Sequence, residues 1–161
     1  MFDQFNQILS NWSKEVAKNN EIEAIIQFGS TCSRPIKKET DVDILYILNF
    51  HKKLSRSDSY RITNNWDLSL EKTIKNELKD YNIIVNSLVK TVSQLDHLSP
   101  IYLDFPDRSN ILFDRFNHAK NLLDNIKTWI TRNKAQRIQK GNLWYWIYDD
   151  KPSHIPVDFK F

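Results

Sequence analysis

The stretch Ile25-Ile26-Gln27-Phe28-Gly29-Ser30 is followed, after ten residues, by Asp41-Val42-Asp43-Ile44-Leu45-Tyr46-Ile47-Leu48. Each apolar run has the length of a buried strand; a Gly-Ser pair ends the first, and two acids begin the second. Because side chains at i and i+2 leave a strand on the same face, Asp41 and Asp43 are expected to lie close together. Two such carboxylates repel unless a cation lies between them, and Mg²⁺ prefers oxygen ligands that include phosphates. The two motifs therefore predict a phosphate-binding turn beside a divalent-metal site.

The composition indicates one ordinary domain. The chain has 161 residues, 40% of them hydrophobic and 27% charged, which is enough apolar material for a packed core. We expect a single domain over residues 1–161, with a core over about 20–95 and a C-terminal helix and aromatic strand over about 100–161. The net charge of +3 suits an anionic substrate, and no long Lys/Arg run requires a nucleic-acid partner.

The cellular setting is predicted from cysteine use and hydropathy. The single cysteine, Cys32, leaves no internal disulfide and suits a reducing compartment. The first residues, Met-Phe-Asp-Gln-Phe-Asn, lack the basic and apolar regions of a signal peptide. No apolar run reaches the roughly 20 residues that span a bilayer. We therefore expect a cytoplasmic protein that does not enter a membrane.

Hydrophobic periodicity predicts the order of elements. Helices are expected over about 2–19, 57–79 and 115–132, and strands over about 22–28, 41–49, 81–91, 111–113 and 142–148. Residues 31–39 contain Pro35 and read as a short helical turn or a loop. This connection is too short for an ordinary crossover helix, so the strands it joins are expected to be antiparallel or linked by one helical turn. The predicted fold class is α/β or α+β, with a small mixed sheet flanked by helices.

The spacing Gly29-Ser30, ten residues, Asp41-x-Asp43 resembles the DNA polymerase β-like nucleotidyltransferases, in the minimal form called MNT. Later segments are also similar to small bacterial or archaeal members of that superfamily. These segments are Pro100-Ile101-Tyr102-Leu103-Asp104, Ile111-Leu112-Phe113-Asp114 and Gly141-Asn142-Leu143-Trp144-Tyr145-Trp146. The resemblance implies the nucleotidyltransferase fold.

The resemblance also implies roles for four residues. Gly29 lets the backbone approach a triphosphate closely, and the Ser30 hydroxyl binds phosphate oxygens. Arg34, which follows this pair closely, is a further candidate that attracts the triphosphate through its charge. Asp41 and Asp43 are the catalytic pair and hold Mg²⁺ while a hydroxyl attacks the α-phosphorus of the nucleotide. The expected substrate is a nucleoside triphosphate, with ATP the first candidate.

One feature of the family pattern is missing. Active members usually present a third carboxylate from the next core strand, whereas the strand predicted here offers Asn82, Asn86 and Ser87. Asp80, just before that strand, is the nearest acid, and Asp104 is an acid from elsewhere that could substitute. An Asn carbonyl can coordinate a metal, but it brings no charge and is a poor base. If neither Asp80 nor Asp104 replaces the third carboxylate, the remaining alternative is a protein that binds nucleotide and transfers it slowly or not at all.

Two functions follow from these observations. The first is Mg²⁺-dependent transfer of a nucleoside monophosphate to a hydroxyl of a protein, an RNA or a small molecule. The resemblance implies an antitoxin that modifies a HEPN-type ribonuclease toxin, or a toxin that acts on tRNA. The alternative is a catalytically weakened module that binds a nucleotide or a partner because it lacks the third acid.

Other residues with reactive or aromatic side chains receive simpler interpretations. Cys32 has no partner histidine and is expected to be a small packed side chain. Lys37 and Lys38 fit triphosphate attraction and ordinary surface charge equally well. The Trp144–Trp146 segment could stack a base, but its alternating side chains are expected to pack on both faces of an edge strand.

Overall fold

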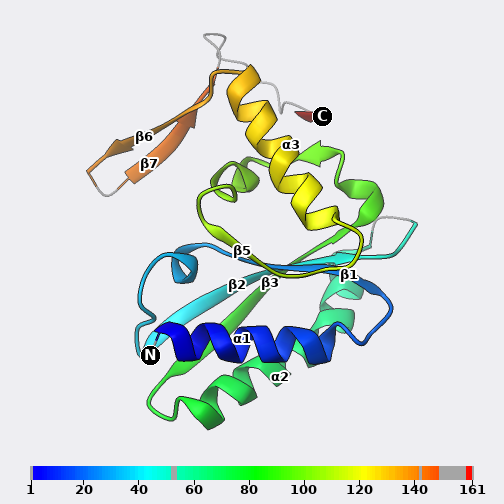
Figure 1. Cartoon of the computed structure of the whole chain (residues 1–161), viewed down its shortest axis with the longest axis vertical. Coiled ribbons are helices and arrows are strands. Elements are labelled where there is room, and N and C mark those ends of the chain that lie inside the picture. The colour runs from blue at the N-terminus through cyan, green and yellow to red at the C-terminus, as the bar shows by residue number, and fades with distance from the viewer. Residues whose placement is uncertain (1, 52–53, 142, 149–158, 161) are drawn as a thin grey trace.

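The computed structural model describes residues 2–51, 54–141, 143–148 and 159–160 (Figure 1). Its helices are α1 (Phe2–Val16), α2 (Arg56–Glu77) and α3 (His118–Arg132), with short 3-10 helices η1 (Ser30–Cys32), η2 (Val92–Gln94) and η3 (Pro100–Asp104). Its strands are β1 (Ile22–Phe28), β2 (Glu39–Leu48), β3 (Asn82–Thr91), β4 (His97–Leu98), β5 (Ser109–Asp114), β6 (Gln136–Lys140), β7 (Leu143–Ile147) and β8 (Phe159–Lys160).

A mixed sheet of order β3-β2-β1-β5 forms the centre of the molecule. β1 is antiparallel to both β2 and β5, whereas β2 and β3 are parallel and are joined through α2. A parallel pair needs such a crossover, because a tight turn can only reverse the chain. The predicted fold class and the antiparallel pairing of the first two strands are confirmed.

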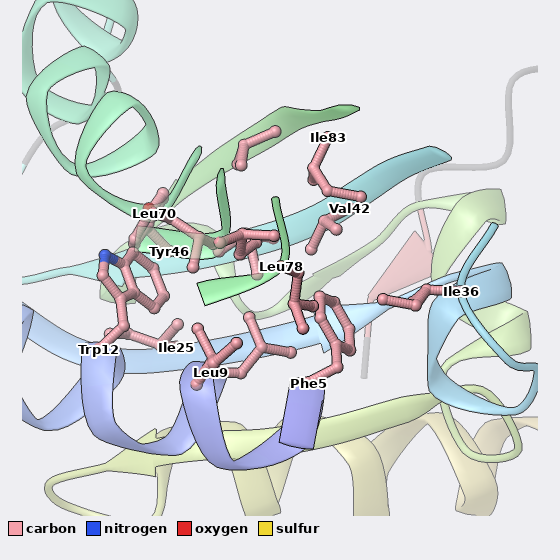
Figure 2. Close-up of a cluster of buried hydrophobic side chains, with 14 of the residues drawn as sticks. Phe5, Leu9, Trp12, Ile25, Ile36, Val42, Tyr46, Leu70, Leu78 and Ile83 are labelled. Atoms are coloured by element: carbon pink, nitrogen blue, oxygen red, sulfur yellow. The ribbon is translucent and has the colours of Figure 1, made fainter. Parts of the chain in front are cut away.

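Helices α1 and α2 cover one face of this sheet (Figure 1). Every second residue of β2 from Val42 to Leu48 points into this layer, where Tyr46 packs against the rings of Trp12 and Trp66. Figure 2 shows side chains from α1, α2 and three strands meeting in this cluster. Removing such side chains from water, at about 1.5–3 kcal/mol each, stabilises the layer.

Helix α3 and η3 cover part of the opposite face. The alternate residues Leu45 and Ile47 of β2 pack there with Tyr102 and Phe105, and β1 is buried along its whole length. The same face of β2 continues toward its N-terminal end with Asp41 and Asp43, which lie beyond this apolar cluster. The two layers therefore leave the first residues of β2 open to solvent.

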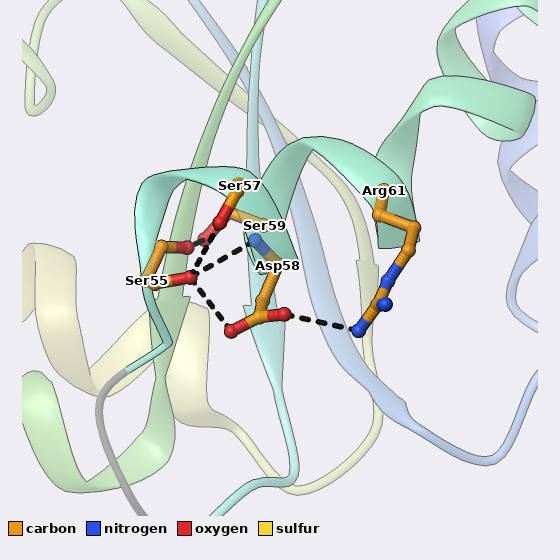
Figure 3. Close-up of polar contacts among 5 residues, drawn as sticks. All are labelled: Ser55, Ser57, Asp58, Ser59 and Arg61. Atoms are coloured by element: carbon orange, nitrogen blue, oxygen red, sulfur yellow. Dashed lines mark hydrogen bonds and ion pairs between the residues drawn. The ribbon is translucent and has the colours of Figure 1, made fainter.

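Helix α2 begins with a capped N-terminus (Figure 3). The Ser55 hydroxyl accepts the backbone N–H of Asp58 at 3.1 Å and lies 2.6 Å from the Asp58 carboxylate. The other Asp58 oxygen pairs with Arg61 at 3.0 Å. A serine in this position satisfies a backbone donor that the first helical turn leaves without a partner.

The observed bounds differ from the predicted ones in a few places. Strand β2 starts two residues earlier than predicted, and the helix expected over about 115–132 begins at His118, after β5 ends at Asp114. The sequence did not predict β6, which pairs with the aromatic strand β7. Among the described residues, no helix combines the length and the apolar character required to cross a bilayer.

Replacing Ser55 by alanine should lower the free energy of unfolding by about 0.5–2 kcal/mol, because the Asp58 N–H loses its acceptor. Urea unfolding followed by circular dichroism measures this change. Ser57→Ala is the matched control, since Ser57 belongs to the same turn but does not accept the Asp58 N–H. Equal losses in the two variants would contradict the capping role.

Candidate functional site

Gly29 and Asp43 are neighbours across two antiparallel strands. Phe28 pairs with Asp43 in the β1–β2 register, so Gly29 leaves the end of β1 directly beside the Asp43 carboxylate. Gly29 has φ +84° and ψ −154°, a conformation that side chains strongly disfavour. A Cβ atom placed on Gly29 would also overlap Asp43 Oδ2 and would lie 3.4 Å from Cγ. Both the backbone and the contact therefore require glycine here.

A buried polar network holds the Gly-Ser turn in place. The Gln27 side chain donates to the Thr31 hydroxyl at 3.1 Å and accepts from the Asn110 amide at 3.1 Å. The Gly29 N–H donates to the Arg108 carbonyl at 3.0 Å. Because Gln27 and Thr31 are almost completely buried, these bonds are shielded from water and fix the turn against β5. Ser30 remains exposed between these anchored residues.

The two acids of β2 have different surroundings. Asp41 is exposed, whereas Asp43 is partly buried and hydrogen-bonded to the side chain of Asn86. Burial raises the pKa of the Asp43 carboxyl above its ordinary value, the Asn86 hydrogen bond opposes this change, and the charge of Asp41 adds to it. A bound cation would remove the repulsion between the two carboxylates. The pair is therefore electrostatically suited to bind a cation.

These acids lie in a cavity of about 670 Å³ at the open end of β2. The turn after β1 contributes Ser30, Arg34 and Lys37, and β2 contributes Glu39, Asp41 and Asp43. Of the five residues predicted for the site, four line this cavity. The fifth, Gly29, lies directly against Asp43 at the edge of the cavity. Cations and carboxylates in one cavity suit a ligand in which phosphates and a metal ion are held together.

The acids considered for the third position lie elsewhere. Asp80 is exposed in the turn before β3 and does not line the cavity. Asp104 accepts the Trp146 indole N–H at 2.9 Å, lies 3.4 Å from Arg137 Nε and does not line the cavity. Ser87 points to the other face of the sheet, where it donates to Asp67 at 2.7 Å. Asn86 pairs with Asp43 in the parallel register, and its side chain hydrogen-bonds the Asp43 carboxylate.

Glu39 is a site residue that the sequence reasoning missed. It lines the cavity and precedes Asp41 by two residues on the same strand, so three carboxylates follow one face of β2. The i, i+2, i+4 spacing was visible in the sequence. The strand was predicted to begin at residue 41, however, so Glu39 fell in the preceding loop.

The residues present fit Mg²⁺ only together with a ligand. Within the described part of the chain, no three histidine, cysteine, aspartate or glutamate side chains converge well enough to hold a metal ion. Mg²⁺ is commonly held by one or two carboxylates with the substrate phosphates and water completing its coordination. Asp41 and Asp43 match the one or two carboxylate ligands that a protein supplies in such a site.

The surroundings of Cys32 disfavour its thiolate, which is the nucleophilic form. Burial raises the pKa of its thiol to about 12, the Asn110 backbone partly opposes this, and the charge of Asp43 raises it further. The thiolate is therefore scarce at neutral pH. The expectation of a packed side chain agrees with its partly buried position.

Comparison with known proteins gave matches only among solved structures. No protein-family model matches the chain, and neither does any curated protein. The chain is similar to a toxin–antitoxin structure with AMP-PNP, at 13% identity over 76% of this chain and 87% of the other, with a TM-score of 0.43. It is also similar to the toxin–antitoxin MntA–HepT, at 11% identity over 78% and 87% of the two chains and a TM-score of 0.41. A third similar structure is a tri-AMPylated Shewanella oneidensis HEPN toxin in complex with an MNT antitoxin, at 12% identity, 78% and 87% coverage and a TM-score of 0.37.

Gly29→Ala should destabilise the protein by about 1–3 kcal/mol from backbone strain alone, with a further loss from the contact with Asp43. Chemical unfolding measures the total. Gly141→Ala is a matched control, since Gly141 also has positive φ, at +62°, but a Cβ there meets nothing within 4 Å. If both variants lost the same stability, the close approach of Gly29 to Asp43 would be disproved.

Proposed function

We propose that this chain is a Mg²⁺-dependent nucleotidyltransferase that moves a nucleoside monophosphate from a triphosphate, ATP first, to a hydroxyl. One observation supports this most strongly: Asp41 and Asp43 lie in a single cavity with Ser30, Arg34 and Lys37. A triphosphate bridged to carboxylates by Mg²⁺ needs both sets of groups at once. The cavity has room for such a ligand, since small-molecule sites usually measure about 300–1,000 Å³.

The residues of the turn act on the phosphates in this proposal. The exposed Ser30 hydroxyl lines the cavity and would bind phosphate oxygens, while Gly29, which has no Cβ, lets the turn lie directly against Asp43. Arg34 and Lys37 supply positive charge at the same cavity and attract the triphosphate. The network of Gln27, Thr31 and Asn110 keeps the turn rigid, so the turn loses little conformational entropy when a nucleotide binds.

The carboxylates position the metal and the reacting groups. When bound, Mg²⁺ would neutralise charge on the phosphates as the hydroxyl oxygen bonds to the α-phosphorus and pyrophosphate leaves. Asp41 and Asp43 would hold it from one strand, and the hydrogen bond from Asn86 would orient Asp43. Glu39, farther along the same face, adds negative charge that attracts the cation. The protein contributes positioning and electrostatics rather than a covalent intermediate.

We propose the chemical class of the molecule whose hydroxyl accepts the nucleotide. The family that the motifs resemble modifies hydroxyls of HEPN-type protein partners or of RNA, and either is compatible with an open cavity. We propose that this chain belongs with such toxin–antitoxin systems of the cytoplasm.

The second candidate function is a binding module that transfers nucleotide weakly. It is favoured by Asn86, a neutral amide beside Asp43 where active members of the resembled family usually have a carboxylate. An amide can orient Asp43 and coordinate through oxygen, but it accepts no proton from the attacking hydroxyl.

Incubation with each α-labelled NTP, Mg²⁺ and either a HEPN-type protein or RNA should transfer label to one acceptor. Asp41→Asn with Asp43→Asn should abolish transfer, because the metal loses its two charged ligands. Chelation of Mg²⁺ should do the same. Labelling that persists in the double variant would contradict the proposal.

Thermal unfolding, together with label transfer, distinguishes the binding module from the transferase. Both candidates predict that NTP with Mg²⁺ raises the melting temperature of the wild type, since a ligand that binds only the folded state stabilises it. A shift without label transfer supports the binding module. If millimolar NTP gave no shift and no transfer, both functions would be wrong.

Asn86→Asp should raise the transfer rate about tenfold or more if the missing acid limits the chemistry, because general-base catalysis contributes about 10²–10⁴-fold elsewhere. Single-turnover label transfer measures this rate. Asn82→Asp is the control: it adds a charge to the same strand and lines the cavity, but it lies opposite Glu39 instead of Asp43. An equal or lower rate in Asn86→Asp than in the wild type would reject the view that Asn86 weakens the enzyme.

A further inference from the structure

Strands β6 and β7 form a two-stranded hairpin that extends away from the central sheet beyond the end of α3 (Figure 1). In the view of Figure 1 it points to the same side of the molecule as the turn after β1. The register pairs Gln139 with Trp144, Ile138 with Tyr145 and Arg137 with Trp146. Neither the fold nor the proposed nucleotide site accounts for the exposed rings of Trp144 and Tyr145 on this hairpin.

The hairpin is fixed to the body at its base. The Trp146 indole donates to Asp104 at 2.9 Å, and Arg137 Nε lies 3.4 Å from the same carboxylate oxygen. Asp104 ends η3, and the next residue, Phe105, packs on the Phe28 ring with centroids 4.8 Å apart. Because Phe28 precedes the Gly-Ser turn, a short chain of contacts joins the hairpin to the nucleotide site. The hairpin is therefore held in a defined position relative to the cavity.

Its outer half presents aromatic rings to solvent. Trp144 is 45% exposed and Tyr145 is 48% exposed, whereas Trp146 is only partly accessible. The expectation that the alternating side chains of this segment pack on both faces of an edge strand is therefore wrong for Trp144 and Tyr145, because a two-stranded arm has no further layer to cover them. The Arg137 guanidinium lies over the Trp144 ring, 4.6 Å from its centroid, and supports that ring from one side.

The hairpin segment carries an excess of positive charge. From Trp129 to Tyr148 the sequence contains four cationic residues and no aspartate or glutamate, although Arg137 is paired with Asp104 and the sequence continues with Asp149 and Asp150. Arg132, Lys134 and Lys140 are exposed. An acid-free segment of this kind attracts polyanions, and its exposed rings offer faces on which bases can stack.

We propose that the β6–β7 hairpin binds single-stranded nucleic acid, with bases stacking on Trp144 and Tyr145 and phosphates near Arg132, Lys134 and Lys140. Exposed rings among cations match the recognition of unpaired strands, because every base has a stacking face and every linkage a negative charge. A protein strand would explain the exposed rings but would also have to be acidic to match the cations, whereas every nucleic-acid strand carries the required negative charge. The proposal that the bound strand also accepts the nucleotide rests on the proposed function. The proposal that the hairpin binds the strand does not.

Fluorescence anisotropy with an unstructured labelled RNA, and with DNA of the same sequence, tests this proposal without NTP and with EDTA present. Wild type should bind at least one of the two strands and should bind the annealed duplex more weakly. Trp144→Ala should weaken binding about fivefold or more, the effect expected for losing one base–aromatic stack. Trp144→Phe should retain most of the affinity, since it keeps a stacking face.

Two controls distinguish the hairpin from general surface effects. Tyr60 on α2 is 68% exposed, so Tyr60→Ala removes a still more accessible ring at another place and should not change binding. Lys134→Ala with Lys140→Ala should reduce the slope of log affinity against log salt by about 0.7 per residue. Lys72→Ala with Lys75→Ala, which removes two exposed cations of α2, should leave the slope unchanged.

The outcomes separate this proposal from the transferase. Asp41→Asn with Asp43→Asn should bind the strand as well as wild type, so failure of the nucleotide site does not affect this test. Absence of binding by wild type to both strands would overturn the proposal, as would equal losses in Trp144→Ala and Tyr60→Ala. Wild type that bound a HEPN-type protein through Trp144, and neither strand, would instead assign the hairpin to a protein partner. Unchanged melting temperatures confirm that the variants are folded.

Discussion

The antiparallel pairing of Phe28 with Asp43 is the constraint on which the site depends. It brings the end of β1 against the beginning of β2, so that Gly29 touches the Asp43 carboxylate. Only a residue without Cβ fits there, and the backbone conformation at φ +84° imposes the same requirement. The buried amide of Gln27 then ties the following turn to β5 through Thr31 and Asn110. The turn that we propose binds phosphate and the acidic pair that we propose binds a cation are thereby held as one rigid unit.

The layered architecture determines where that unit opens to solvent. Helices α1 and α2 cover one face of the sheet, while α3 and η3 cover only part of the other. β2 therefore carries Leu45 and Ile47 under η3 and α3 but presents Asp41 and Asp43 at its uncovered end. This location is physically favourable, because two neighbouring carboxylates could not be buried without a large desolvation cost. The same opening admits the positively charged turn after β1.

Much of this could be predicted from the sequence, and the failures have physical reasons. β1 was predicted with its observed bounds because a run of buried apolar residues ends at Gly29. β6 was missed because Gln136-Arg137-Ile138-Gln139-Lys140 has one apolar side chain and so lacks the hydrophobic alternation of a strand. Its backbone pairing with β7 stabilises the strand instead. Glu39 was missed because the ladder with β3 extends the strand two residues beyond its apolar part.

The sequence by itself determined the local chemistry: a glycine turn, two acids at strand spacing, and helices with one apolar face. These follow from side-chain type and from periods of 2.0 and 3.6 residues, which are properties of neighbours along the chain. Only the tertiary structure decided that Asn86 lies beside Asp43, that Asp104 anchors Trp146, and that Asp80 lies outside the cavity. Such pairings depend on strand order and register, which are set by the burial of both sheet faces at once and cannot be read from any single segment.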